Sequence, residues 1–364
     1  MTGNTLGWVI VAFVLYLLMM IAIGAFYAKG NNNSEDYFLG GRKLNGFVAA
    51  LSAQASDMSG WLLMGLPGAI YLTGVGGDGW IAIGLFIGTT LNWLFIATKL
   101  RRYTIRANNS VTLPTYFENR FHDDKKVLMT VSSITIVVFF LVYCASALSA
   151  GGQLFESVFG IDYHVALTIG ALVVLVYTFL GGFTAVCVTD FIQGMLMLVG
   201  ILAVPLFAYH FLTGNGTTLA AGLEASGADS ANFLNLMKNG DGSNNIISVI
   251  SGLGWGLGYF GMPHILVRFM AVRDEKEMTK SKATAISWVA LSLGFAVFIG
   301  ILGRAYLPEL VNGNNEKVFI EMIKKVFTVE MRAPFIAGLF LCGILAAIMS
   351  TADSQLLVSA SSVA

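Results

Sequence analysis

The sequence predicts an all-α protein that crosses a membrane many times. Of its 364 residues, 56% are hydrophobic and 12% are charged, whereas a soluble domain carries about a quarter charged residues. The mean hydropathy is +0.75. Long apolar runs alternate with short polar segments that hold most of the charge, which is the pattern of a polytopic helical membrane protein.

The apolar runs divide into nine predicted spans. No charged residue precedes Lys29, and the first run has neither the positive start nor the short apolar core of a signal peptide, so we interpret it as a transmembrane helix. In order along the chain, the predicted spans cover residues 6–28, 46–73, 78–98, 127–156, 163–181, 184–213, 245–271, 281–307 and 332–361.

Basic residues indicate the orientation of these spans. Most of the 21 Lys and Arg residues lie in the segments 29–45, 99–126 and 268–282, which share one side if the spans alternate. The positive-inside rule makes this side cytoplasmic and places the N-terminus outside. Segments 214–244 and 308–331 then become external, and the second carries a short amphipathic helix over 318–326. The expected location is the bacterial cytoplasmic (inner, plasma) membrane.

The chain ends at Ala364, directly after the ninth apolar run. No linker, soluble segment or low-complexity tract divides it. We therefore expect residues 1–364 to be a single transmembrane domain whose final helices are missing.

Two of the spans are interrupted. The second contains Ala55-Ser-Asp-Met-Ser-Gly60, and the seventh contains four glycines and a proline between Gly254 and Pro263. Unwound backbone is tolerated in a membrane only where it lines a cavity, and paired interruptions point to a transporter binding site. The two spans are five apart, as two inverted five-helix repeats require. The alternative is that the glycines serve only helix packing.

A stripe of small and hydroxyl residues in the ninth span suggests a cation site. Ala347, Ser350 and Thr351 share one helix face. Together with carbonyls at Ala55 and Met58 they offer the oxygen ligands that a hard cation needs. Alternatively, the two hydroxyls bond back to their own helix, which the spacing alone favours.

Three aspartates lie within apolar runs, where a carboxylate is costly and by default functional. Asp57 is the deepest of them. We expect Asp190 to lie in an aqueous vestibule near the inner start of the sixth span. Asp353 is interpreted equally well as a solvated charge at the inner end of its helix or as part of an ion path.

The composition excludes several other classes of protein. The formal net charge is zero, so no basic field suggests nucleic-acid binding. Cys144, Cys187 and Cys342 have no metal-ligand spacing and are predicted to pack in apolar surroundings. Gly256-Leu-Gly-Tyr-Phe-Gly261 matches GxGxxG but lacks the strand that a dinucleotide site requires. No acid–base pair or activated nucleophile is visible, so we expect neither an enzyme nor a cofactor.

At these motifs the sequence resembles the solute:sodium symporter family, most closely its bacterial sodium/proline branch. The resemblance runs from the first span to Ala364. Its landmarks are Asp36-Tyr-Phe-Leu-Gly-Gly-Arg42, Ser56-Asp-Met-Ser-Gly-Trp-Leu-Leu-Met-Gly-Leu-Pro-Gly68, Gly254-Trp-Gly-Leu-Gly-Tyr-Phe-Gly-Met-Pro-His-Ile-Leu266 and Leu345-Ala-Ala-Ile-Met-Ser-Thr351.

This resemblance implies a leucine-transporter-type core of two inverted five-helix repeats, preceded by one extra helix, and sodium-coupled symport of L-proline. It implies a sodium site at Ala55, Met58, Ala347, Ser350 and Thr351, with sodium as the coupling ion. It places substrate among Ser59, Tyr143, Trp255 and Tyr259, with Pro263 shaping the broken helix, and assigns coupling or gating to Asp57, Arg42 and Asp190.

Two alternatives remain open at this stage. One is a family member for another small solute, such as a sugar, pantothenate or another amino acid. The other is a transporter-like sensor domain.

Overall fold

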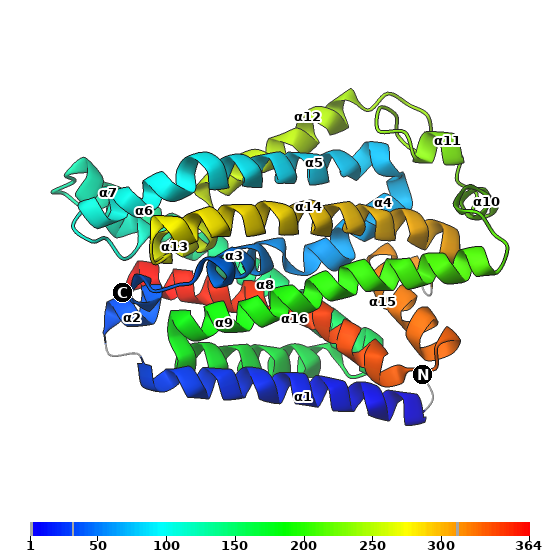
Figure 1. Cartoon of the computed structure of the whole chain (residues 1–364), viewed down its shortest axis with the longest axis horizontal. Coiled ribbons are helices and arrows are strands. Elements are labelled where there is room, and N and C mark those ends of the chain that lie inside the picture. Colours follow the sequence, from blue (N-terminus) through cyan, green and yellow to red (C-terminus); the bar gives the residue numbers. More distant parts are fainter. Residues whose placement is uncertain (1–2, 31–32, 311–312) are drawn as a thin grey trace.

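The computed structural model describes residues 3–30, 33–310 and 313–364. Two residues of each predicted connecting segment 29–45 and 308–331 lie outside this range. The described residues form helices and short turns, with two isolated bridges and no β-strand. The all-α prediction is therefore confirmed. The helices form an elongated bundle in which the long ones run roughly side by side (Figure 1).

Six helical stretches are long and apolar enough to cross a membrane. They are α1 (Gly3–Tyr27), Val75–Arg106, α8 (Val127–Phe159), α9 (Tyr163–Gly214), α14 (Glu275–Tyr306) and α16 (Pro334–Val363). Val75–Arg106 comprises α5 (Val75–Leu91), the π-helical turn η4 (Asn92–Ile96) and α6 (Ala97–Arg106). A seventh candidate is a bent pair, α12 (Ile246–Gly254) with the 3₁₀ turn η5 (Trp255–Gly261), followed by α13 (Pro263–Ala271).

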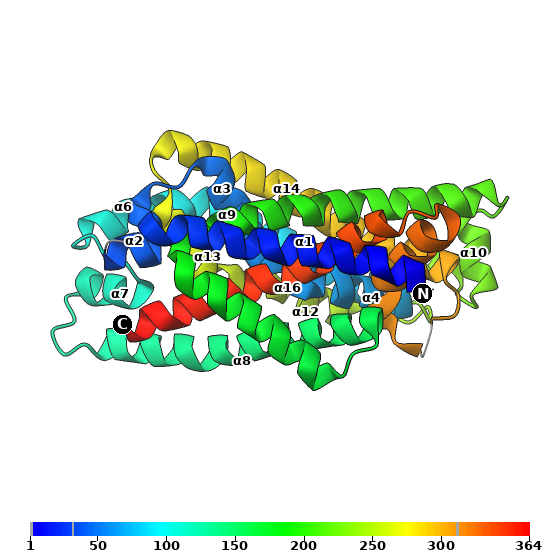
Figure 2. The same cartoon turned by 90° about the horizontal axis from the view of Figure 1, so that it is seen from below.

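The nine predicted spans map onto these elements with two differences. The predicted spans 163–181 and 184–213 are joined in the 52-residue α9, which breaks at Gly182 (φ 61°, ψ −161°). Figure 2 shows the two halves of α9 folding back on each other at this break. The predicted span 46–73 is divided into α3 (Gly46–Gly60), the π-helical turn η3 (Trp61–Gly65) and α4 (Leu66–Thr73).

The segments between the spans are more helical than predicted. The predicted inner segments contain α2 (Ser34–Leu39), the end of α6, α7 (Leu113–Phe121) and the start of α14. Helix α14 begins at Glu275 because the Asp274 side chain accepts the backbone N–H of Glu277 at 2.9 Å. The predicted external segments contain α10 (Leu219–Ala225), α11 (Ser230–Phe233), and α15 (Val318–Ile323) with the π-helical η8 (Lys324–Glu330). The predicted amphipathic helix is confirmed, since its apolar side chains are buried.

The three basic segments meet at one end of the bundle, opposite the start of α1 (Figure 1). Arg42 donates hydrogen bonds to the carbonyls of Met270 and Ser110, each at 2.8 Å. Arg101 donates to the carbonyl of Val272 at 2.7 Å. These basic side chains thus hold together segments that are far apart in the sequence. In the sequence analysis they counted only as positive charges.

Helix α16 forms the centre of the packing and contacts α1, α3, α8 and α9. It is buried along most of its length, which includes Ser350, Thr351, Asp353 and Ser354. Small residues allow the close approach: a Cβ on Gly338 would lie 2.8 Å from the Cβ of Ala12 on α1. The predicted cation stripe therefore lies in the interior of the bundle.

Candidate functional site

Helix α3 breaks at Ser59, which has φ 51° and ψ −173°. A positive φ is uncommon for a residue with a side chain. The Ser59 hydroxyl accepts the backbone N–H of Trp61 at 3.1 Å, which holds the chain as it enters η3. The predicted interruption within residues 55–60 is confirmed, and Ser350 of the buried α16 stripe bonds to Ala55 of the same segment.

The second break lies between α12 and α13, whose axes differ by 47°. Pro263 occupies the first turn of α13, where its missing N–H costs nothing. The glycines also serve close packing: a Cβ on Gly256 would lie 2.2 Å from the Gly84 carbonyl oxygen on α5. Unwinding and packing, which the sequence presents as alternatives, therefore occur together here.

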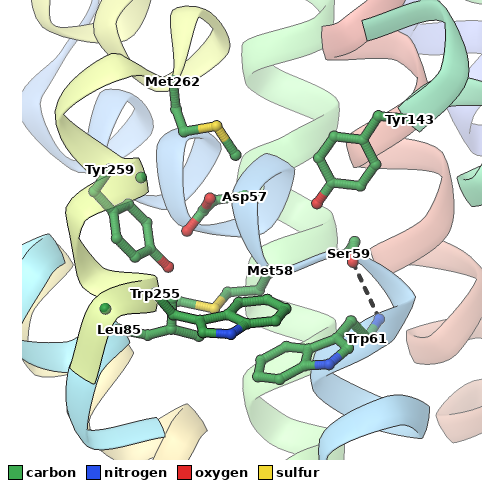
Figure 3. A pocket seen from close by; sticks show the side chains of 11 residues that line it. Asp57, Met58, Ser59, Trp61, Leu85, Tyr143, Trp255, Tyr259 and Met262 are labelled. Atoms are coloured by element: carbon green, nitrogen blue, oxygen red, sulfur yellow. Dashed lines mark hydrogen bonds between the residues drawn. The ribbon is translucent and has the colours of Figure 1, made fainter. Parts of the chain in front are cut away.

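A cavity of about 440 Å³ lies where the two breaks meet. Four of the five predicted substrate residues line it: Ser59, Tyr143, Trp255 and Tyr259. Pro263 is buried but is not part of the lining. The remaining lining residues are Asp57, Met58, Trp61, Leu85, Gly254, Gly258 and Met262. Figure 3 shows Tyr143 and Tyr259 on opposite sides with their hydroxyls pointing inward, and two indoles along one wall.

Asp57 is the carboxylate of this cavity (Figure 3). It is 8% exposed, and its Oδ2 has no hydrogen-bond partner in the described part of the chain. His264 Nε2 lies 3.9 Å from the other oxygen, Oδ1. A buried carboxylate oxygen without a partner is costly, so its position in a cavity wall suggests that a ligand satisfies it.

The predicted cation residues are brought together in part. Ser350 Oγ donates to the carbonyl of Ala55 on α3 at 2.9 Å and lies 3.2 Å from the carbonyl of Ala347. Thr351 Oγ1 donates back to Ala347 at 3.0 Å. The Met58 carbonyl accepts the N–H of Trp61. Ser350 thus reaches across to α3, whereas Thr351 shows the back-bonding to its own helix that the spacing favoured.

Asp190 lies in a closed ion-pair network, so its predicted place in an aqueous vestibule is wrong. It is fully buried. Its Oδ2 accepts from Arg268 Nη2 at 3.0 Å and from the Ser52 hydroxyl at 2.6 Å. Arg268 also donates to Ser354 at 2.5 Å. The network ties α3, α9, α13 and α16 together where a water-filled space was expected.

Asp353 is also fully buried, so its interpretation as a solvated end charge is wrong. Tyr177 Oη donates to Asp353 Oδ2 at 2.5 Å, and the Ser354 hydroxyl donates to Oδ1 at 3.1 Å. Through Ser354, Asp353 joins the network of Arg268 and Asp190. Within this network, two carboxylates face a single guanidinium.

The importance of Arg268 was missed in the sequence, where it was counted among the basic residues of an inner segment. The side chain is instead fully buried in α13. It follows an apolar stretch and lies five residues before Arg273. Its position inside an apolar run was the available signal, because a charge there is rarely left unpaired.

Among the described residues, no group of three or more His, Cys, Asp or Glu side chains is arranged to hold a metal ion. All three cysteines are free and buried, as predicted for packing residues.

An all-helical membrane bundle with two interrupted helices meeting at a cavity has the architecture of a secondary transporter. The model of the sodium:solute symporter family matches residues 37–364. The chain belongs to this family, and it is a multi-pass membrane transporter.

Two relatives have high similarity over nearly the whole chain. The chain is 44% identical over 360 residues to the sodium/proline symporter of Escherichia coli (strain K12), covering 97% of this chain and 69% of the relative. It is 43% identical over 355 residues to the sodium/proline symporter of Staphylococcus aureus (strain JH9), covering 97% of this chain and 66% of the relative. The chain thus spans about two thirds of the length of these relatives.

A solved structure supports the fold. The substrate-bound, outward-open state of a Na⁺-coupled sialic acid symporter superposes with a TM-score of 0.80 at 20% sequence identity. The match covers 98% of this chain and 73% of the other. The predicted symporter fold is confirmed by this likeness.

Proposed function

We propose that this chain carries out sodium-coupled symport of L-proline into the cell by alternating access. The observation that carries the proposal is the cavity at the two helix breaks, where the unpartnered Oδ2 of Asp57 faces an aromatic wall. The identity of 43–44% with sodium/proline symporters supports proline as the solute.

The aromatic wall fits a small cyclic zwitterion. Trp255 and Tyr259 present flat apolar surfaces to a pyrrolidine ring, and Tyr143 and Ser59 present hydroxyls. The substrate carboxylate is expected near the backbone N–H groups freed at a helix break. Pro263 acts by fixing the start of α13, since it lies outside the lining.

The sodium site is assigned to Ala55, Met58, Ala347, Ser350 and Thr351. The 2.9 Å hydrogen bond from Ser350 to Ala55 supports this assignment, because two of the five oxygens already converge across α3 and α16. Neutral oxygens hold sodium without the strong attraction of several carboxylates, so the ion is readily released. Ser350 and Thr351 donate their hydroxyl protons to backbone carbonyls, so the lone pairs of both hydroxyl oxygens would be free to coordinate a sodium ion.

Asp57 couples the two sites in this proposal. It lies on the same interrupted segment as the sodium carbonyls of Ala55 and Met58 and the substrate residue Ser59. Sodium binding that orders this segment therefore also orders the substrate cavity. Gating is assigned to Arg42 and Asp190. Arg42 links segments at the proposed inner end, and Asp190 belongs to the network around Arg268 that joins four helices.

The driving force is sufficient for accumulation. One charge crossing about 100 mV releases about 2.3 kcal/mol, and a tenfold sodium gradient adds about 1.4 kcal/mol. One sodium ion per solute thus supports roughly 500-fold accumulation of a neutral zwitterion. The proposed location is the bacterial cytoplasmic membrane, where residues 1–364 act as one transport domain. The N-terminus is placed outside, because the basic segments share the end of the bundle opposite the start of α1.

The test is uptake of labelled proline by the protein in proteoliposomes, with an inward sodium gradient or with choline in place of sodium. Sodium-dependent uptake that only close proline analogues inhibit is expected. Equal uptake driven by a proton gradient would contradict the ion assignment. Binding of a sugar, pantothenate or another amino acid in preference to proline would contradict the substrate.

A further inference from the structure

A second cavity of about 530 Å³ adjoins the first. The two share Ser59, Trp61, Tyr143, Trp255 and Met262 in their linings. The second cavity alone is lined by Ser146, Ser149 and Gln153 of α8 and by Glu316. Glu316 belongs to the segment between α14 and α15, at the end of the bundle where α1 begins. This cavity is therefore the more polar one and extends toward the proposed outer side.

Two indoles form the shared wall. The rings of Trp61 and Trp255 are stacked with centroids 6.0 Å apart and planes 18° apart. Figure 3 shows them side by side below Asp57. Trp255 is 51% exposed, so core packing alone does not fix its ring. Trp61 is the aromatic ring that contacts it among the described residues.

Two local contacts hold Trp61 in place. The Ser59 hydroxyl accepts its N–H at the helix break. On the other side the indole lies against Gly65, where a Cβ would be 2.5 Å from Trp61 Cδ1. Gly65 has helical angles, φ −65° and ψ −58°, so its backbone tolerates alanine. The glycine is needed for the space that the indole fills.

We propose that Trp61 is a specificity-determining residue: stacked on Trp255, it separates the solute cavity from the second cavity and limits the size of the solute admitted. This inference deepens the proposed function and rests on it for the identity of the solute. A solute coming from the Gln153 side must displace the stack to reach Asp57. Small cyclic or aliphatic zwitterions do so, and bulkier amino acids are excluded.

The stack also sets the scale of the effect. The interaction free energy of an offset-stacked aromatic pair corresponds to about a 2- to 13-fold shift in the equilibrium between the stacked and the separated rings. Removing the Trp61 indole therefore increases the open fraction of the wall by this factor. The Trp61→Phe variant keeps part of the stack and falls between the parent and Trp61→Ala.

Site-directed labelling tests the wall directly. Leu85 lines only the first cavity and Gln153 only the second, so a single cysteine is introduced at either position. A polar maleimide is applied to the purified protein in detergent, and labelling of Cys144, Cys187 and Cys342 in the parent is subtracted. Trp61→Ala is expected to accelerate labelling of Leu85→Cys about 2- to 13-fold and to leave Gln153→Cys unchanged.

Two further variants separate the wall from general loosening. Gly65→Ala displaces the Trp61 indole without removing it and is expected to accelerate labelling at position 85 as well. Trp8→Ala is the matched control, because Trp8 contacts Phe335 in an aromatic pair at 6.5 Å, and neither residue lines these cavities. Unchanged labelling at position 85, or equal acceleration at both positions, overturns the proposal.

The specificity is measured as the ratio of uptake of pipecolate, the six-membered-ring homologue of proline, to uptake of proline. Trp61→Ala raises this ratio, and an unchanged ratio contradicts the selective role. Labelling requires neither sodium nor proline. A failure of the proposed symport therefore shows in the uptake of the parent protein, and a failure of the wall shows in the labelling.

Discussion

Replacement of Ser350 by alanine tests the sodium site most sharply. The hydroxyl is fully buried and is the one that bridges α16 to the Ala55 carbonyl of α3. As a sodium ligand it contributes about 1.5–3 kcal/mol, the range for hydrogen bonds to charged groups. Its loss is expected to raise the half-saturating sodium concentration roughly 10- to 150-fold, with maximal uptake largely retained at saturating sodium.

The assay measures initial proline uptake in proteoliposomes over a wide range of sodium concentrations at constant ionic strength. Ser292→Ala is the matched control, because Ser292 is equally buried and donates to Val289 of its own helix, α14, at 3.3 Å. Both variants lose one buried hydroxyl. Only Ser350→Ala is expected to change the sodium dependence.

A purely structural role for Ser350 gives a different result. Its hydroxyl would then contribute only the hydrogen bonds to Ala55 and Ala347. The variant would unfold at a lower temperature and keep the parent sodium dependence. Uptake by Ser350→Ala that saturates at the parent sodium concentration would refute the site.

Three further predictions concern the rest of the fold. Arg268→Met leaves Asp190 buried without its counter-ion and is expected to lower the free energy of unfolding by about 3–5 kcal/mol. A fluorescence thermal-shift assay in detergent should show this as a lower unfolding temperature, and the double variant with Asp190→Asn should recover much of the lost stability. Gly256→Ala places a Cβ 2.2 Å from the Gly84 carbonyl oxygen and should abolish proline uptake by separating η5 from α5. Gly214→Ala is the control and should leave uptake unchanged, because the added Cβ meets no neighbouring atom within 4 Å in the described part of the chain. The backbone N–H of Glu277 lowers the pKa of Asp274 at the start of α14. Because the folded-state pKa is the lower one, the cap stabilises the helix above the unfolded pKa and is lost as pH falls through the folded pKa. The protection factor of the Glu277 amide, which is its hydrogen-exchange rate corrected for the intrinsic pH dependence, should therefore fall at acid pH in the parent and be low at all pH values in Asp274→Ala.

Some features followed from the chain alone because they depend on local composition. The apolar runs predicted most long helices to within a few residues. Helix-weakening residues predicted both interruptions, and the first break falls at Ser59, within the predicted segment 55–60. Helical spacing placed Ala347, Ser350 and Thr351 on one face. These signals are local, since span length and helix periodicity are set by the backbone and the solvent.

Other features required knowledge of which helices meet. Arg268 was counted as a loop charge because it lies near other basic residues in sequence, and only packing of α13 against α3, α9 and α16 shows its burial. Asp353 was left between two interpretations, and its partner Tyr177 is 176 residues away. A sequence records that a charge is present but not what neutralises it.

The sequence by itself determined the class of protein, the long helices and the two broken segments, because apolar length and backbone-breaking residues act within one helix. The four predicted substrate residues that line the cavity came from the family resemblance. The tertiary structure decided the contacts that cross helices. It placed Ser350 against Ala55, Asp190 against Arg268, and Trp61 against Trp255. The physical reason is that burial and ion pairing depend on the surroundings of a side chain, and in a bundle those surroundings are supplied by segments distant in the chain.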